Sequence, residues 1–330
     1  MNRKILVMGA GSWGTALALQ LARVGHMVYI NSWKEAHNTQ MITDKHNNTY
    51  LPDTPFPTNL IAVSNWQYVI SQCDDILVAT PSIGFVTTLK LLKPHLHSKQ
   101  GVISATKGFC HNSYQLLDQI AQDILKDNDF GLITGPSFVK EVASGLPTTV
   151  LATATDRCYA KHIQILFTTD NFRCYTSIDV TGAAIGGAVK NALAIACGIS
   201  DGLGFGANAR AGLITRGLNE LTKLGMTLGG KIETFYGLSG LGDLLLTCTD
   251  NQSRNRRFGV LIGQGKTIHV ACREVKQVVE GIASANAVYK LAQKHCVPMP
   301  IIEAVYDILH EGKDMHTIAY ALLTRSIKAE

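Results

Sequence analysis

The stretch ILVMGAGSWG, residues 5–14, decides the fold of the first half of the chain. A short apolar run typical of a buried strand leads into glycines at positions 9, 11 and 14, and a helical pattern follows over residues 13–24. In this context Gly9 permits a tight turn, Gly11 lets a phosphate group approach the backbone, and Gly14 lets the helix pack closely on the strand. The stretch therefore predicts a strand–turn–helix unit that binds the pyrophosphate of a dinucleotide. The alternative is a glycine-rich turn without a ligand.

Short apolar runs alternate with helical patterns through the first 178 residues. Candidate strands lie at residues 4–8, 27–31, 61–63, 76–79, 102–105, 131–133, 148–152 and 172–175. Helical patterns between them, such as residues 114–125, imply a parallel sheet with helices on both faces. The segment 47–59 carries three prolines and is expected to be a loop.

From residue 179 onward strand-like runs almost vanish. Helical patterns lie at residues 182–200, 209–224, 238–247, 283–293, 301–310 and 317–327. We therefore expect an α/β protein with a Rossmann-type NAD(P)-binding domain over residues 1–180 and an all-α substrate-binding domain over residues 181–330. The apolar segment 181–199 carries Lys190 and Asn191 at its middle, which would be costly in lipid, so we expect a buried helix and no stable membrane insertion.

The composition is that of an ordinary globular protein, with 46% hydrophobic and 17% charged residues. The net charge of +5 is a mild excess that suits anionic small molecules as easily as nucleic acid. No block of five like charges and no interleaving of aromatic and basic residues appears, so no nucleic-acid partner is expected. The eight cysteines form no CxxC pair and have no zinc-ligand spacing. They predict buried thiols in a cytoplasmic protein without a metal site.

The end of the second strand bears on the choice of cofactor. An NAD-selective site usually offers Asp or Glu there for the adenosine ribose. Here the chain reads Asn31, Ser32, Trp33, Lys34, with no acid before Glu35. Lys34 is therefore assigned to a 2′-phosphate and Trp33 to stacking on adenine, which favours NADP, or use of both cofactors, over strict NAD. The alternative is that both side chains cover the surface.

Two loops after candidate strands carry polar residues suited to a substrate. Lys107 follows the strand at 102–105 and is either a solvated loop charge or a cation that faces the substrate. Ser137 precedes a helical turn that ends at Glu141, so it is predicted as a helix N-cap. A helix start also binds phosphate oxygens, so the two roles are compatible.

Lys190 is the sharpest candidate for chemistry, because it lies in a very apolar helical segment. Burial lowers the pKa of an ammonium group, which would poise Lys190 for proton transfer near neutral pH. A structural lysine that snorkels or forms an ion pair is the alternative. Asp243, in the apolar turn that follows the glycine-rich run at 237–242, is the expected partner of Lys190. The alternative is that Asn191 and Asp243 form hydrogen bonds that pack helices together.

The polar run SRNRR, residues 253–257, is suited to a small anion. Ser253 and Asn255 can donate hydrogen bonds, and the Arg254 guanidinium can hold a phosphate through two parallel N–H donors. Solvated arginines on a surface turn are the alternative.

Taken together, these segments resemble the bacterial NAD(P)-dependent glycerol-3-phosphate dehydrogenase family. The matching pieces, in family order, are GAGSWGTALA (9–18), NTYLP (48–52), ATKG (105–108), GPSF…E (135–141), VKNALAIACGISDGLGFGANARAGLITRG (189–217), GLSGLGDLLLTCT…SRNRRFG (237–259) and VEG (279–281). The resemblance implies reversible hydride transfer between sn-glycerol 3-phosphate and dihydroxyacetone phosphate, which feeds phospholipid synthesis. A homodimer is expected, with residues 179–211 and the apolar C-terminal helices as available surfaces.

The resemblance also assigns roles to residues. Lys190 resembles the family's proton donor and acceptor, with Lys107 and Asp243 as further catalytic residues. Positions that match substrate contacts are Lys107, Gly135, Ser137, Asp243, Ser253, Arg254 and Asn255, of which Arg254 and Asn255 take the phosphate. Positions that match cofactor contacts, beside Gly9, Gly11, Gly14, Trp33 and Lys34, are Ser12, Trp13, Lys107, Val139, Arg254, Val278 and Glu280.

Two departures from the family pattern stand out. Val139 replaces a residue that is often Ala in the family, and Trp33 stands where the family usually carries a basic residue. The second departure leaves the preference for NADP over NAD open.

Two other functions fit the same sequence less well. A related hydroxyacid or phosphogluconate dehydrogenase would not need the SRNRR run or the GLSGLGD segment. A non-catalytic NAD(P)-binding redox sensor would not need Lys107, Lys190 and Asp243 together.

Overall fold

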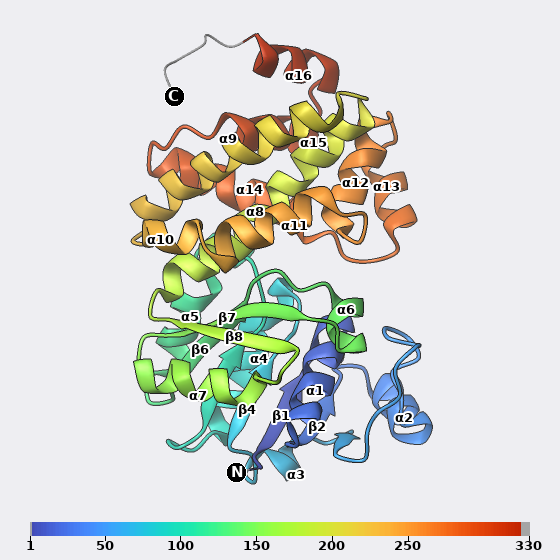
Figure 1. Cartoon of the computed structure of the whole chain (residues 1–330), viewed down its shortest axis with the longest axis vertical. Helices are drawn as coiled ribbons and strands as arrows, with labels where there is room; N and C mark the ends of the chain where they lie inside the picture. The colour runs from blue at the N-terminus through green and yellow to red at the C-terminus, as the bar shows by residue number, and fades with distance from the viewer. Residues whose placement is uncertain (1, 325–330) are drawn as a thin grey trace. The chain divides into compact units, whose positions relative to one another are not determined.

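The computed structural model describes residues 2–324, which form two compact units (Figure 1). The first, called the sheet unit, comprises the chain up to Cys110 together with Gln115–Ala184. The second, called the helical unit, takes in His111–Tyr114 and the chain from Ile185 onward. The division falls inside one helix, α8 (Val180–Gly202), so no flexible linker separates the units in sequence.

The sheet unit is built on one sheet, with eight strands among the described residues in the order β3-β2-β1-β4-β5-β6-β7-β8. The strands are β1 (Lys4–Met8), β2 (Met27–Asn31), β3 (Leu60–Ala62), β4 (Asp75–Val78), β5 (Gly101–Ser104), β6 (Phe130–Thr134), β7 (Thr148–Ala154) and β8 (Phe172–Ser177). The order reverses direction at β1 and β4, and ligands bind at the carboxyl ends of the strands at such a switch point. The expected Rossmann-type α/β fold is confirmed, with strand bounds within about two residues of those expected.

The expectation of a fully parallel sheet is wrong for its last part. β7 pairs antiparallel with β6, and β8 then runs parallel to β7. The connection between β6 and β7 contains only the six-residue helix α6 (Val139–Ser144). A helix of that length spans about 9 Å, whereas β6 is about 16 Å long. With so short a helix the connection does not return the chain along β6, and β7 starts at the edge where β6 ends.

Apolar side chains cover both faces of the sheet. Along β1, Ile5 and Val7 belong to one buried cluster, while Leu6 and Met8 belong to the other. Successive residues of a strand point to opposite faces, so β1 contributes to both cores. The first cluster contains residues of α1 (Ser12–Val24), α2 (Glu35–Asp44), α6 and α7 (Arg157–Phe167). The second contains residues of α3 (Gln67–Ile70), α4 (Ser82–Leu92) and α5 (Leu117–Leu125).

The helix expected over residues 114–125 begins later, at Leu117. Tyr114 has a φ of 58°, in the left-handed region that interrupts a helix. Leu116 forms an isolated antiparallel bridge with Phe109, which holds the preceding turn.

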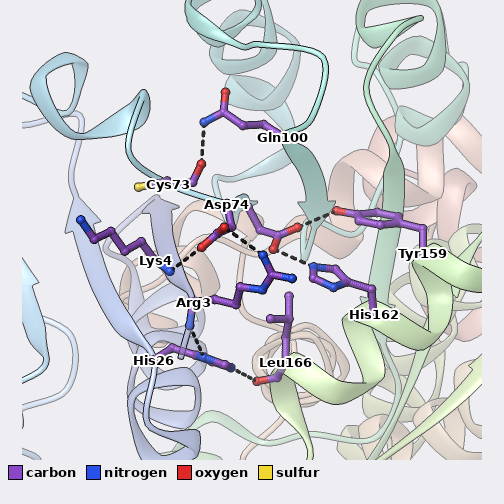
Figure 2. Close-up of polar contacts among 10 residues, drawn as sticks. Arg3, Lys4, His26, Cys73, Asp74, Gln100, Tyr159, His162 and Leu166 are labelled. Carbon is purple, nitrogen blue, oxygen red and sulfur yellow. Dashed lines mark hydrogen bonds and ion pairs between the residues drawn. The ribbon is translucent and has the colours of Figure 1, made fainter. Parts of the chain in front are cut away.

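The amino-terminal ends of the strands carry a polar network that ties β4 to α7 (Figure 2). Asp75, at 1% exposure, lies 2.7 Å from His162 Nε2 and accepts a hydrogen bond from the Tyr159 hydroxyl at 3.3 Å. Arg3 donates to Asp74 at 3.0 Å, beside the same strand. Because ligands bind at the opposite ends of these strands, the network contributes to stability and not to a site.

The helical unit has no strand among its described residues, which confirms the expected all-α second half. Besides α8, its helices are α9 (Gly206–Thr227), α10 (Ile232–Phe235), α11 (Asp243–Thr249), α12 (Arg254–Gly263), α13 (Ile268–Val275), α14 (Glu280–Lys294), α15 (Pro300–His310) and α16 (Met315–Leu323). The helix expected over residues 238–247 is instead a π turn, Leu238–Gly242, followed by α11. The sequence did not predict α10, α12 and α13, and positions 325–327 of the last expected helix lie outside the described residues.

Helices α8 and α12 cross at four glycines. A Cβ added at Gly198 would lie 2.2 Å from the carbonyl oxygen of Arg256, and one at Gly259 would lie 2.3 Å from that of Ile195. Gly202 and Gly263 make the same kind of approach one turn later. Only glycine allows two backbones to come so close. The crossing fixes where α12 starts relative to α8, and both helices carry candidate site residues.

Helix α8 is the one helix in the described part of the chain that is long and apolar enough to cross a membrane by length and composition. Its most apolar window is 89% buried inside the protein, so it has the character of a core helix, as Lys190 and Asn191 predicted.

All eight cysteines are free thiols. The expectation that they are buried holds for Cys73, Cys174, Cys197 and Cys248. It is wrong for the others: Cys158 and Cys296 are exposed, and Cys110 and Cys272 are half-buried.

Candidate active site

The glycine turn between β1 and α1 has the geometry that its sequence predicted. Gly9 has a φ of +116°, and a Cβ there would lie 2.7 Å from the carbonyl oxygen of Ala79. A Cβ at Gly14 would lie 1.9 Å from the carbonyl oxygen of Gly9. A Cβ at Gly11, in contrast, would meet nothing within 4 Å. Gly9 and Gly14 therefore shape the turn, and the backbone at Gly11 borders open space.

The groups around this turn fit a dinucleotide. Gly11 is the N-cap of α1 and offers no side-chain cap, so the first N–H groups of the helix are left for an anion. Two buried polar atoms beside the turn, Trp13 Nε1 and Thr80 Oγ1, have no hydrogen-bond partner among the described residues. Such groups are costly unless a ligand or water satisfies them. Ser12 opens α1 at the same place. Thr80 was not predicted; its place after β4, next to the switch point, is the signal that points to it.

The end of β2 exposes an aromatic and a cation. Trp33 is 84% exposed, and Lys34 Nζ lies 5.1 Å from the centroid of its ring. This cation–π contact holds the lysine beside the ring in solvent. Both side chains are thus available to a ligand, and their assignment to adenine and a 2′-phosphate stays a prediction.

Three predicted substrate residues meet after β5 and β6. Lys107 Nζ donates to the carbonyl oxygen of Gly135 at 3.4 Å, and Ser137 Oγ donates to the same oxygen at 2.9 Å. Gly135 has a φ of +122°, which turns its carbonyl toward them. The prediction of Ser137 as a helix N-cap is wrong, because Phe138 occupies that position of α6 without a side-chain cap, and the Ser137 hydroxyl is committed to Gly135. Val139 opens α6 and packs against the first core cluster.

In the helical unit Lys190 forms a buried polar group with Asp243 and Thr247. Lys190 Nζ lies 2.5 Å from Asp243 Oδ1 and 2.8 Å from Thr247 Oγ1. Lys190 is 7% exposed and Asp243 1%. The Thr247 hydroxyl donates in turn to the backbone carbonyl of Asp243 at 2.6 Å. This arrangement confirms Asp243 as the ion-pair partner that the sequence suggested.

The π turn before α11 brings Asp243 to this position. A Cβ at Gly186 would lie 2.3 Å from the carbonyl oxygen of Ser239, so α8 and the turn touch backbone to backbone. π turns recur at functional sites because they redirect side chains within a helix. Thr247 was not predicted as a site residue, although its spacing of four from Asp243 places both on one helix face.

The arrangement suits proton transfer. Two fixed oxygens, Asp243 Oδ1 and Thr247 Oγ1, accept from the Lys190 ammonium, so the buried side chain is held in place. Removing one partner of such a buried pair costs about 3–5 kcal/mol because the other charge is left unpaired. A lysine in this setting can deliver a proton to an oxygen and recover it.

The start of α12 contributes two polar side chains with defined partners. Ser253 is the N-cap of α12 and accepts from the backbone N–H of Arg256 at 3.2 Å. Asn255 Nδ2 donates to Asn191 Oδ1 at 2.9 Å, and Asn255 Oδ1 accepts from the backbone N–H of Gly281 at 3.0 Å. Asn255 is thereby joined to the residue next to Lys190. Arg254 is exposed.

The predicted residues thus fall into two groups, one in each unit. The sheet unit holds Gly9, Gly11, Ser12, Trp13, Gly14, Trp33, Lys34, Lys107, Gly135, Ser137 and Val139. The helical unit holds Lys190, Asp243, Ser253, Arg254, Asn255, Val278 and Glu280. Val278 is 63% exposed, and Glu280 opens α14. Within residues 2–324 no group of three or more His, Cys, Asp or Glu side chains is placed to hold a metal ion.

Comparisons of this chain with known proteins all point to one family. The N-terminal part of the NAD-dependent glycerol-3-phosphate dehydrogenase family matches residues 4–160, and its C-terminal part matches residues 179–320. The glycerol-3-phosphate dehydrogenase [NAD(P)+] of Francisella tularensis subsp. novicida is 58% identical over 100% of both chains.

Solved structures give the same result. The crystal structure of glycerol-3-phosphate dehydrogenase from Coxiella burnetii has a TM-score of 0.95 and 42% identity, over 98% of this chain and 99% of that one. The enzyme of that name from Saccharomyces cerevisiae has a TM-score of 0.84 and 26% identity, over 97% of this chain and 99% of that one. The two matched parts together cover far more than half of the sequence. This chain belongs to the NAD-dependent glycerol-3-phosphate dehydrogenase family.

Proposed function

We propose that this chain catalyses reversible hydride transfer between sn-glycerol 3-phosphate and dihydroxyacetone phosphate, with NADP or NAD as cofactor. The observation that carries the proposal is the buried group of Lys190, Asp243 and Thr247, in a chain whose relatives are named glycerol-3-phosphate dehydrogenase [NAD(P)+]. Residues 1–180 would hold the cofactor, and residues 181–330 would supply the proton and the main phosphate ligand.

The glycine turn and the start of α1 would hold the pyrophosphate. When bound, the cofactor supplies or accepts the hydride at C2 of the substrate. Trp13 Nε1 and Thr80 Oγ1 are buried donors beside the turn that gain a partner in this way. Trp33 and Lys34 would lie along the adenosine, with Val139, Arg254, Val278 and Glu280 as further contacts.

Lys190 would move the proton. In the reductive direction negative charge develops on the C2 oxygen, and the ammonium of Lys190 donates a proton to it. Asp243 and Thr247 keep the nitrogen in place throughout and favour its return to the charged form. In the oxidative direction the neutral amine takes the proton of the C2 hydroxyl. A preorganised donor of this kind is worth roughly 2.7–4 kcal/mol of barrier.

The remaining polar residues would bind and orient the substrate. Lys107 would polarise the carbonyl, with Gly135 and Ser137 beside it. The exposed guanidinium of Arg254 would hold the phosphate through two N–H donors, aided by Asn255 and Ser253. Binding energy from the phosphate, which does not react, would position the carbonyl for transfer.

We further propose that the reaction supplies glycerol 3-phosphate for phospholipid synthesis in the cytoplasm, and that the chain works as a homodimer. Support for the dimer comes from large apolar side chains left on the surface of the helical unit, such as Phe205 on the approach to α9 and Leu323 on α16, at 42% and 67% exposure.

The test is absorbance at 340 nm with dihydroxyacetone phosphate and either NADPH or NADH. Oxidation that requires this substrate is expected, and the ratio of the two rates gives the cofactor preference. Pyruvate and other oxoacids serve as controls for a hydroxyacid dehydrogenase. A folded protein that binds NADPH but oxidises it with none of these substrates would be a non-catalytic sensor, and the proposal would fail.

A further inference from the structure

A chain of buried polar side chains fastens the loop after β2. Ser32, His37, Asn38 and Asn47 are all less than 9% exposed, and none of them was predicted as a site residue. Asn38 fixes the loop backbone, because its Oδ1 accepts from Ser32 N–H at 2.7 Å and its Nδ2 donates to the Ser32 carbonyl at 2.8 Å. The Ser32 side chain is held separately, by His37.

The orientation of Asn47 follows from its partners. Its Nδ2 donates to the carbonyl oxygen of Ala10 at 2.9 Å and to Thr15 Oγ1 at 2.8 Å. The Ala10 carbonyl can only accept, so the nitrogen of the amide must face it. Asn47 Oδ1 therefore faces the other way, where it accepts from the backbone N–H of Tyr50 at 3.2 Å. Asn47 thus presents an acceptor to His37.

This acceptor fixes the tautomer of His37. His37 Nε2 lies 3.0 Å from Asn47 Oδ1, so Nε2 must carry a proton. In a neutral imidazole the other nitrogen, Nδ1, is then an acceptor. Nδ1 lies 3.1 Å from Ser32 Oγ, so Ser32 must donate its only hydroxyl proton to it. Ser32 Oγ also accepts from Lys34 N–H at 3.3 Å, which leaves only acceptor capacity for a ligand.

We propose that His37 is a specificity-determining residue that acts through Ser32: by drawing the Ser32 proton inward, it makes the end of β2 an acceptor for the 2′-hydroxyl of an adenosine ribose. The inference rests on the proposed function, since it concerns the cofactor of that reaction. In this fold an acid at the end of β2 usually accepts from the ribose. Ser32 Oγ takes over part of that task, whereas a 2′-phosphate, itself an acceptor, finds no donor there.

The relay opposes the attraction of Lys34 for a 2′-phosphate. Lys34 is held in solvent beside Trp33, where its charge favours NADP. Ser32 favours NAD from the same loop. The two effects together account for the use of both cofactors. His37 thereby sets the ratio of the affinities for NAD and NADP.

The surroundings of His37 hold its ring in this orientation. The imidazole faces Ser32, Asn47 and Tyr50, whose ring lies edge-on with its centroid 5.3 Å away.

The test measures the dissociation constants of NADH and NADPH by cofactor fluorescence on the full chain, without substrate. The variants are His37→Phe, Ser32→Ala and both together. We expect His37→Phe to shift the affinity ratio toward NADPH by about tenfold, the effect of one hydrogen bond to a charged group. The shift should vanish in the Ser32→Ala background. Equal weakening of both cofactors, or a shift that persists in the double variant, would overturn the proposal.

A second measurement covers the case in which His37→Phe does not fold. Ser32→Ala alone then removes the acceptor and leaves Lys34 in place. A loss of NADH affinity with NADPH affinity kept supports the relay, and equal weakening of the two cofactors contradicts it. Because these experiments need no turnover, a failure of the reaction with dihydroxyacetone phosphate would overturn the proposed function and leave this result readable.

Discussion

Lys190 is a buried ammonium whose position is set by two oxygen atoms, and its replacement by methionine is the most direct test of the chemistry. Lys190→Met removes the proton donor but keeps a chain of similar length. We expect kcat to fall by about 10²–10³-fold, the effect of losing one preorganised donor. NADPH affinity should stay unchanged, because the glycine turn belongs to the other unit. Steady-state kinetics and fluorescence titration measure the two quantities.

The control for this variant is the pair Lys190→Met with Asp243→Asn. The single variant leaves Asp243 buried without its cation, which costs about 3–5 kcal/mol of stability. The double variant removes both charges, so its melting temperature should recover while its kcat stays low. Recovery of kcat together with stability would show that Lys190 has only a structural role.

Asp118 predicts how stability depends on pH. Burial raises the pKa of its carboxyl to about 7, with a smaller contribution from Asp179, although the N–H groups of Asp118 and Gln119 act in the opposite direction. It lines a cavity of about 20 Å³ beside Lys107, large enough for about one water molecule.

The sign follows from the raised pKa. The folded state holds the proton more tightly than the unfolded state. The stabilisation is therefore full below the ordinary carboxyl pKa of 3.8 and is lost as pH rises toward about 7. The loss is on the order of 4 kcal/mol. We expect Asp118→Asn to melt at a higher temperature than the unaltered protein at pH 8, with a smaller difference at pH 5. Melting curves across this range would contradict the argument if the difference did not change with pH.

At the scale of elements, the glycines of the turn between β1 and α1 have two different roles: Gly14 allows close packing, and Gly11 leaves space for a ligand. Gly14→Ala places a Cβ 1.9 Å from the carbonyl of Gly9, so it should force α1 away from the turn and lower the melting temperature of the ligand-free protein. Gly11→Ala meets nothing within 4 Å and should leave that temperature unchanged. It should nevertheless weaken NAD(P)H binding, because the methyl group occupies the space for the pyrophosphate. Unchanged cofactor affinity in Gly11→Ala would place the cofactor elsewhere.

The crossing of α8 and α12 predicts a link between packing and substrate affinity. Gly198→Ala should cost about 1–3 kcal/mol through overpacking and should raise KM for dihydroxyacetone phosphate, because α12 carries Arg254 and Asn255. Gly212→Ala, on a part of α9 where a Cβ meets nothing within 4 Å, is the matched control. It should leave KM unchanged and stability equal or slightly higher. Equal effects of the two substitutions would show that the crossing does not position α12.

At the scale of the whole molecule, the proposed dimer is open to a direct measurement. The chain has a mass of 35.7 kDa, and sedimentation equilibrium at micromolar concentration should give twice that value. Residues of α8, α9, α15 and α16 line a cavity of about 680 Å³, and Phe205 and Leu323 belong to this lining. Leu323→Glu should therefore favour the monomer. A mass of one chain at all concentrations would rule out a stable dimer.

Much of the fold could be read from the sequence, because local patterns determine it. The strand at residues 4–8 and the glycines after it fix β1, its turn and α1 through steric rules that act over a few residues. The direction of β7 could not be read, because the apolar run at 148–154 has the same alternation in either direction. The short helices α12 and α13 were missed, since their apolar faces become visible only against α8 and its neighbours.

Site residues could be predicted where the residue type and its sequence surroundings together indicate a chemical role. Lys190 within an apolar helix required a partner, and Asp243 was the available acid. Thr247, Thr80 and the Ser32–His37–Asn47 relay were not predictable, because hydroxyl and amide groups occur everywhere and gain meaning only from the atoms they face. The N-cap assignment of Ser137 was wrong for the same reason: its hydroxyl turns to the Gly135 carbonyl, an oxygen two residues away.

The four glycines at the crossing of α8 and α12 also say how this protein can evolve. A contact made by backbone against backbone offers no side chain that natural variation could enlarge, trim or exchange. Natural substitutions that alter the candidate site should therefore fall on residues near the ends of α8 and α12, while the distance between the two helices stays constant. A saturation mutagenesis library should show the fewest tolerated replacements, among buried positions of the helical unit, at Gly198, Gly202, Gly259 and Gly263. A design for a new substrate should therefore leave these four glycines unchanged.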